Sequence, residues 1–211
     1  MWAISLTNTI NTPKLLAYGT DDSEEIGYSF LLMEYIELGD IKDEFWNVFA
    51  EKLASMHKAD TSSLVKNGKF GFLQDNFIGR TKQINLAKDS WVEFFRDNRL
   101  VPQFKMAEKY FEKDDLSKID KLLNKLDKIL VEPEKPSLLH GDLWGGNVLC
   151  DTKSLPLLID PACYVGHPEA DIAMTELFGG FLENFMMHIK IQGFCNQVIQ
   201  SVEICIICII F

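Results

Sequence analysis

The chain has 211 residues, of which 47% are hydrophobic and 25% charged, an ordinary globular composition that excludes intrinsic disorder and the fibrous classes. Its net charge of −10 repels nucleic acid and anionic lipid, so we expect neither as a partner. No apolar run reaches the roughly 18 residues that a membrane span needs, and the five cysteines form no even disulfide framework, which favours a cytoplasmic location.

The N-terminal part predicts a β-hairpin. Residues 13–18 and 28–36 are β-prone apolar runs, and the stretch between them is rich in turn-forming residues. Residues 66–80 contain three glycines and no sustained period, which predicts a loop with a strand-like fragment. Helices are predicted where apolar residues recur at intervals of three and four, over residues 43–58, 90–100 and 116–130.

The C-terminal half predicts short strands and one more helix. The helix begins near Asp171 and runs to Phe185, and the pair Gly179-Gly180 is expected to weaken it. The strands are predicted from apolar runs flanked by polar or glycine residues, at residues 137–139, 148–150 and 157–159.

The densest group of polar and turn-forming residues is the segment HGDLWGGN, residues 140–147, followed by DPA at residues 160–162. If the strands at 148–150 and 157–159 pair, Asn147 and Asp160 lie at the open end of one hairpin and can share a Mg²⁺ ion. Asp142 can then accept a proton from a substrate hydroxyl. These segments could instead be simple turns, but the order and spacing of the whole set favour chemistry.

The arrangement His140-x-Asp142-x-x-x-x-Asn147, followed by Asp160, is typical of a kinase catalytic loop and metal-binding turn. The blocks HGDLW, GN, DPA, GH-x-EAD and LFGGF resemble the signature region of the fructosamine-3-kinase (ketosamine kinase) family, which is related to the aminoglycoside phosphotransferases. Upstream, FLLMEYI, LASMH, FGF and SWVEFFRDNRL resemble the same family. The resemblance extends from about residue 3 to about residue 185.

This resemblance implies an α+β, protein-kinase-like fold of two lobes. Residues 1–38 would be a partial nucleotide-binding N-lobe with the hinge, and residues 39–211 a mainly helical C-lobe with a short catalytic-loop hairpin. The implied activity is ATP-dependent phosphoryl transfer to a hydroxyl of a small-molecule or protein-linked ketosamine. Two alternatives are a catalytically inactive kinase-like binding module and a phosphotransferase that acts on another small alcohol.

The resemblance also implies a role for each residue of the site. Asp142 would be the catalytic base, while Asn147 and Asp160 would hold Mg²⁺ and the nucleotide. The hinge residues Met33, Glu34, Tyr35 and Ile36 would meet the adenine. His140 and Asp171 would support the loop, and three residues would touch the substrate or else form or brace the wall of the site: Trp144, His167 and Glu169.

Other residues carry weaker expectations. Gly71, Gly79, Gln83 and Asn85 fall in a segment that resembles the family's substrate-side insertion, and His57 is expected to cap or pack its helix. The pair Cys205 and Cys208 has metal-like spacing but no second pair, so we expect no zinc site there.

The sequence also departs from the family pattern. No glycine-rich loop, ATP lysine or glutamate-bearing helix precedes the first strand, and Lys14 does not match the ATP lysine. After Phe185 the residues no longer resemble the family. We therefore expect an incomplete nucleotide lobe and little or no kinase activity from these 211 residues alone.

Overall fold

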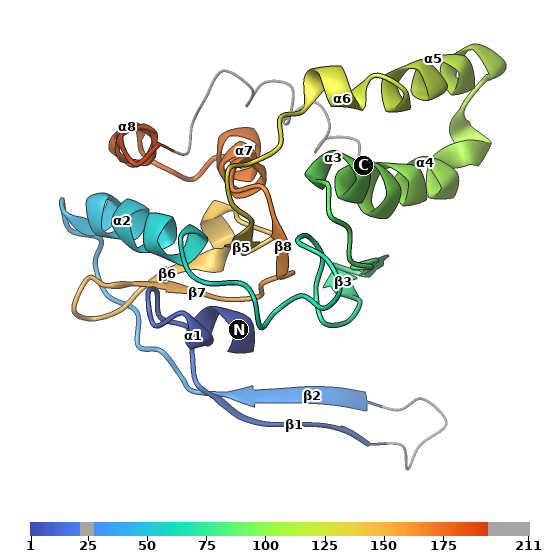
Figure 1. Ribbon diagram of the computed structural model, residues 1–211. Helices are drawn as coiled ribbons and strands as arrows, with labels where there is room; N and C mark the ends of the chain where they lie inside the picture. The colour runs from blue at the N-terminus through green and yellow to red at the C-terminus, as the bar shows by residue number, and fades with distance from the viewer. Residues whose placement is uncertain (22–27, 194–211) are drawn as a thin grey trace.

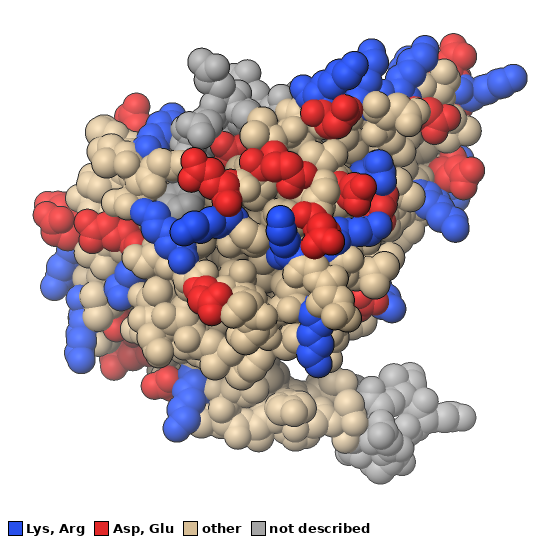
Figure 2. Space-filling view, in the orientation of Figure 1, with Lys and Arg blue, Asp and Glu red and all other residues tan. Residues whose placement is uncertain are grey.

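Two antiparallel strands form the predicted N-terminal hairpin. β1 (Leu15–Asp21) pairs with β2 (Tyr28–Met33), and the hairpin projects from the rest of the molecule (Figure 1). The structure, a computed structural model, describes residues 1–21 and 28–193, so Cys205 and Cys208 lie outside the described residues. Apolar hairpin side chains are exposed, Tyr18 by 77%, and Figure 2 shows a largely uncharged surface there.

The main core forms around α2 (Phe45–His57), which matches the helix predicted at residues 43–58. Phe49 and Leu53 are completely buried, and α8 (Glu183–Ile191) packs along the same helix. The unpredicted helix α1 (Trp2–Leu6) adds Ile4 to this core. A helix of five residues is too short to show a periodic pattern, which explains why it was missed.

The helix predicted at residues 90–100 is longer than expected. It comprises α3 (Trp91–Phe95), a π-helical turn (Arg96–Leu100) and α4 (Val101–Ala107), followed by a 3₁₀ turn (Glu108–Tyr110). Pro102 cannot donate to the carbonyl of Asn98, and that carbonyl accepts from the Arg99 guanidinium at 3.0 Å instead. The helix therefore continues through a residue that would normally interrupt it.

The helix predicted at residues 116–130 forms in two pieces, α5 (Lys113–Leu123) and α6 (Leu126–Ile129). A capping box between Glu112 and Asp115 starts α5 early. No residue of α5 is buried, whereas Leu126 and Leu130 belong to a second core with Trp91 and Phe94. The C-terminal end of α5 also reaches this core, because Leu122 and Leu123 pack against it while partly exposed.

Short strands surround the predicted catalytic loop. β6 (Val148–Cys150) pairs with β7 (Pro156–Leu158), which confirms the predicted hairpin with its second strand shifted by one residue. β5 (Ser137–Leu139) pairs with β8 (Tyr164–Gly166), which was not predicted. The predicted loop at residues 66–80 contributes to a further hairpin, β3 (Asn76–Ile78) and β4 (Thr81–Gln83).

The last predicted helix is interrupted. α7 (Glu169–Phe178) ends at Gly179 and Gly180, whose φ angles are +67° and +91°, and the chain resumes helically as α8. Across residues 1–21 and 28–193, no helix is long and apolar enough to cross a membrane.

Candidate active site

One buried carboxylate organises the start of the predicted catalytic loop. Asp171, in the first turn of α7, accepts hydrogen bonds from the backbone N–H groups of His140 at 2.8 Å and Gly141 at 2.9 Å. It also contacts Nε2 of His57 at 2.9 Å from the end of α2. Burial opposes its ionisation, but the hydrogen bond from His57 and the one from the backbone N–H of Gly141 help to outweigh this, and the pKa of Asp171 is lowered.

His140 links this carboxylate to the hairpin that carries Asp160. Its Nε2 lies 2.9 Å from the carbonyl oxygen of Ile159, and its Nδ1 accepts from the N–H of Asp142 at 3.3 Å. A carbonyl oxygen only accepts, so the proton resides on Nε2. Burial lowers the pKa of His140, which is consistent with a neutral ring. His140 thus supports the loop and leaves no ring nitrogen for proton transfer.

Asp142 follows directly and is only partly buried. Nδ2 of Asn147 donates to the carbonyl oxygen of Asp142 at 2.8 Å and lies 3.4 Å from its Oδ2. Burial is the main cause that raises the pKa of Asp142, and the negative charges of Asp171 and Asp160 add to it. A carboxylate with a raised pKa that remains open to a ligand can act as a general base.

Asn147 and Asp160 lie near the open end of the β6–β7 hairpin, but the one-residue shift in register pairs Asn147 with Ile159 and leaves Asp160 one residue beyond the pairing. The N–H of Ile159 donates to the carbonyl oxygen of Asn147 at 3.1 Å, which extends the strand pairing by one step. Because Nδ2 of Asn147 is committed to Asp142, its Oδ1 is the atom that remains for a ligand. Asp160 is exposed and has a φ of +48°. An amide oxygen and a carboxylate at this point could hold a hard cation.

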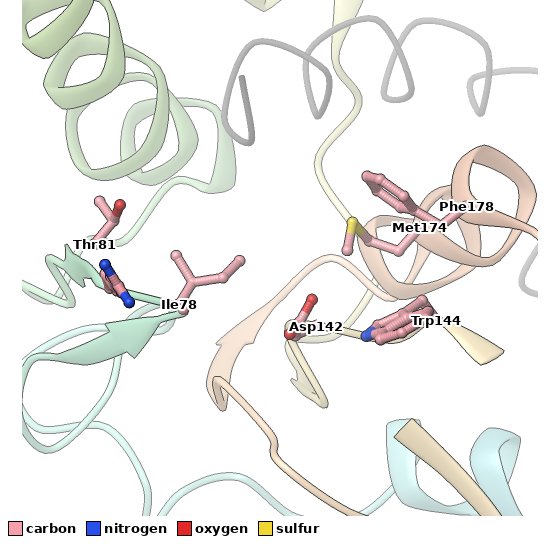
Figure 3. Close-up of a pocket in the computed structure, with 8 residues that line it drawn as sticks. Ile78, Thr81, Asp142, Trp144, Met174 and Phe178 are labelled. Atoms are coloured by element: carbon pink, nitrogen blue, oxygen red, sulfur yellow. The ribbon is translucent and has the colours of Figure 1, made fainter. Parts of the chain in front are cut away.

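A cavity of about 470 Å³ opens above Asp142. Figure 3 shows that the Asp142 carboxylate points into the space between the β3–β4 hairpin on one side and Trp144 and α7 on the other. The volume falls in the range that small-molecule sites occupy. The lining residues come from three segments of the chain: Ile78, Gly79, Arg80, Thr81, Asp142, Trp144, Met174 and Phe178.

Five of these lining residues were not predicted for the site: Ile78, Arg80, Thr81, Met174 and Phe178. Met174 and Phe178 fit the apolar pattern of a helix, and that pattern does not distinguish core from cavity. The signal for the others is the dipeptide Gly79-Arg80, because a glycine at the first turn position is typical of a two-residue hairpin turn. Among the weaker candidates, Gly79 lines the cavity, whereas Gln83 and Asn85 are buried beneath it.

His167 and Glu169 do not line this cavity. Nδ1 of His167 accepts from the N–H of Glu169 at 3.1 Å, and the His167 ring lies 6.0 Å from that of Trp91. Burial lowers the pKa of His167 to about 4, so the ring is neutral at pH 7. Of the two interpretations open for these residues, the structure favours bracing over contact with substrate.

The predicted hinge residues also lie away from the Asp142 cavity. Met33 ends β2, and Glu34 donates its N–H to the carbonyl oxygen of Lys14 at 2.9 Å. Tyr35 is 87% exposed. In the described part of the chain, no backbone hydrogen bond uses the N–H groups of Tyr35 or Ile36, so both could serve a ligand.

We predict that Gly141→Ala destabilises the fold by about 2 kcal/mol or more, because Gly141 has a φ of +82° and a Cβ there would collide with the carbonyl oxygen of Ala162. Gly79→Ala is the matched control: its φ is +55°, but a Cβ meets nothing within 4 Å. Urea unfolding of both variants separates backbone strain from collision. Equal losses of stability in the two variants would contradict the tight packing of the loop against Ala162.

Comparison with known proteins identifies relatives along most of the chain. Residues 1–190 match the family described as fructosamine kinase. The chain is 36% identical over 180 residues to a probable ketoamine kinase of Synechocystis sp., which covers 85% of this chain and 57% of that protein. It is 39% identical over 164 residues to the chloroplastic protein-ribulosamine 3-kinase of Arabidopsis thaliana, which covers 75% of this chain and 48% of the relative. The chain therefore spans about half the length of the curated relatives it matches.

Solved structures also resemble this chain. A crystal structure from Haemophilus somnus, assigned as a fructosamine-3-kinase, superposes with a TM-score of 0.79 at 30% identity and covers 95% of this chain and 64% of that one. An aminoglycoside phosphotransferase crystallised with ADP and hygromycin B gives a TM-score of 0.62 at 17% identity over 94% of this chain and 68% of that one, which shows a shared fold only.

The architecture is thus the α+β, protein-kinase-like fold of small-molecule phosphotransferases, as predicted. Within that class, the chain belongs to the fructosamine kinase family. The family that the HGDLW, DPA and GH-x-EAD blocks predicted is confirmed.

Proposed function

We propose that this chain carries the phosphoryl-acceptor site of an ATP-dependent ketosamine kinase, and that the hydroxyl to be phosphorylated binds at Asp142. The observation that carries the proposal is the position of the Asp142 carboxylate, which lies in a cavity of about 470 Å³ while neutral His140 and Asn147 fix its backbone. The relatives, which are named ketoamine kinases and protein-ribulosamine 3-kinases, favour a ketosamine over the two alternatives, an inactive binding module and a kinase of another alcohol.

In this proposal Asp142 orients the substrate hydroxyl and accepts its proton. Its raised pKa makes it a better base than an exposed aspartate, and its contact with Asn147 limits where the carboxylate can point. Asp171 and His140 hold the loop and do not touch the reacting atoms. The Trp144 indole, 46% exposed beside Asp142, offers a face on which a sugar can stack.

Asn147 and Asp160 are the residues that would hold Mg²⁺ with the nucleotide. Within the described ranges, no group of three or more histidine, cysteine or acidic side chains is arranged to hold a metal. That suits Mg²⁺, which commonly binds one or two carboxylates together with water and phosphate oxygens. When bound, the ion would neutralise charge on the phosphates. The segment Met33, Glu34, Tyr35 and Ile36 would bind the adenine through its backbone.

We also propose residues 1–38 as part of the nucleotide-binding lobe and residues 39–211 as the helical lobe, although Ile4 and Ile10 pack in the core of the helical part. The cytoplasmic location remains a prediction. The free cysteines Cys150 and Cys163 fit a reducing compartment, while the plant relatives are named chloroplastic.

In a form that spans the full length of the relatives, Asp160→Ala should weaken Mg²⁺-dependent ATP binding by at least about tenfold, because metal sites lose 10- to 100-fold in affinity even when an outer-shell partner is removed. Calorimetric titration of ATP with Mg²⁺, and again with the metal chelated, measures this difference. The substitution should remove only the part of the ATP affinity that depends on Mg²⁺.

Asp89→Asn is a matched control, because Asp89 is exposed and does not line the cavity. It should retain the wild-type affinity in both titrations. Unchanged affinity and unchanged metal dependence in Asp160→Ala would remove Asp160 from the metal site.

A further inference from the structure

The turn of the β3–β4 hairpin places an arginine at the cavity. Arg80 lines the same space as Asp142, and its side chain is exposed. Other basic side chains nearby have partners: Lys82 pairs with Asp75 at 3.0 Å, and Arg99 donates to Asn85 at 2.9 Å. Across residues 1–21 and 28–193, the Arg80 guanidinium makes no hydrogen bond or ion pair, so it is available to an anionic ligand.

The hairpin that carries Arg80 is anchored by half-buried Asn76 and by buried Gln83 and Arg99. Asn76 donates to the carbonyl oxygen of Cys163 at 2.7 Å, and Gln83 donates to that of Ala162 at 3.0 Å. Both carbonyls belong to the segment that follows Asp160. From the other side, Nη1 of Arg99 donates to the carbonyl oxygen of Ile84. These bonds fix the strands on both sides of the turn, which sets where Arg80 can reach relative to the catalytic loop.

The cavity therefore has a distinct charge order. Asp142 of the catalytic loop supplies a carboxylate to its lining and Arg80 of the β3–β4 turn supplies a guanidinium, while the apolar surfaces of Trp144, Met174 and Phe178 also line it. A ketosamine carries a secondary ammonium next to its sugar. That cation suits Asp142 and the Trp144 indole face.

We propose that Arg80 recognises a carboxylate on the amine substituent of the substrate, so that the favoured substrate is the ketosamine of a free amino acid. Such a compound is a zwitterion, and its sugar and ammonium would lie towards Asp142. Its alkyl arm would cross the apolar wall, and its carboxylate would pair with Arg80. A ketosamine on a protein side chain has amide groups in place of that carboxylate and would lose this ion pair. This inference rests on the proposed function.

The test is a calorimetric comparison of two ligands that differ only in the carboxylate. The first is Nα-acetyl-lysine carrying a fructosyl group on its side-chain nitrogen, and the second is the methylamide of the same compound. The 211-residue chain should bind the acid about tenfold more tightly, as expected for one charge-assisted ion pair. Arg80→Gln should bring the ratio close to one by weakening binding of the acid only.

Lys82→Gln is the matched control, because it removes a charge from the same hairpin without touching the cavity. It should keep the preference for the acid, and Arg80→Lys should keep part of it. Equal binding of acid and amide by the wild type would overturn the inference and leave the proposed function intact. A preference that survives Arg80→Gln, or that Lys82→Gln also abolishes, would overturn it too.

ATP provides a further arm of the test, because Arg80 could instead meet a phosphate. ATP affinity should be the same in the wild type and Arg80→Gln, and a fall of tenfold in the variant would overturn the assignment to the substrate carboxylate. If neither ketosamine binds, the proposed function fails and this inference fails with it. That outcome is distinguishable from equal binding of both.

Discussion

Asp142→Asn, made in a form that spans the full length of the relatives, is expected to lower the rate of ketosamine phosphorylation by about 100-fold or more while leaving nucleotide and ketosamine binding nearly unchanged. An amide can still accept a hydrogen bond from the substrate hydroxyl, but it cannot take the proton. The backbone N–H and carbonyl groups of residue 142 bond to His140 and Asn147, and these bonds do not depend on the charge of the side chain. The measurement is the rate of formation of phosphorylated ketosamine by mass spectrometry, with protein at substrate concentration so that slow turnover can be followed.

The control for this variant is Asp120→Asn. Asp120 lies on the exposed surface of α5, so this substitution also removes one negative charge, but outside the site. It should keep the wild-type rate. If Asp142→Asn also keeps that rate while both ligands bind, Asp142 is not the base.

Asp171→Asn is expected to lower the free energy of unfolding by about 3 kcal/mol or more, because breaking a buried charged contact leaves its partners unsatisfied. The amide replaces one of the two acceptor oxygens with a donor, so it loses either the bond from Gly141 to Oδ1 or the bonds from His140 and His57 to Oδ2. Urea unfolding at pH 7 measures the loss. Lys118→Gln, which breaks the exposed ion pair with Asp115 on α5, should cost less than about 1 kcal/mol.

The pH dependence of this loss has a definite sign. The pKa of Asp171 is lowered in the folded protein, so its stabilisation is fully present above the unfolded pKa of about 3.9 and is lost as pH falls through the folded value. The stability gap between the wild type and Asp171→Asn should therefore be constant near neutrality and shrink below about pH 4. A gap that widens on acidification would contradict the ionised, hydrogen-bonded carboxylate.

The parts of the site that could be predicted are those that local sequence specifies. A loop between two short apolar runs predicts a hairpin that ends near Asn147 and Asp160, and β6 does pair with β7, with the second strand shifted by one residue. The segment HGD places His140 and Gly141 directly before Asp142 in the chain. The family resemblance supplied Asp171 as the anchor of the loop, and the structure shows its bonds to His140 and Gly141.

The remainder depends on contacts between distant residues. His57 was expected only to cap or pack its helix, yet it meets Asp171 across 114 positions of the chain. The β3–β4 hairpin is stabilised by Asn76 and Gln83 bonding to carbonyls about 80 positions later, which no local pattern reveals. The break between α5 and α6 likewise serves the burial of Leu126, a tertiary effect that overrides helix periodicity.

The most direct test of the central claim is a crystal structure of the chain with a bound ketosamine. We predict that the ligand occupies the cavity between the β3–β4 hairpin and α7, with one sugar hydroxyl within about 2.6 to 3.2 Å of the Asp142 carboxylate. A ketosamine bound elsewhere on the chain, or one whose hydroxyls all point away from Asp142, would contradict the assignment of this cavity as the phosphoryl-acceptor site.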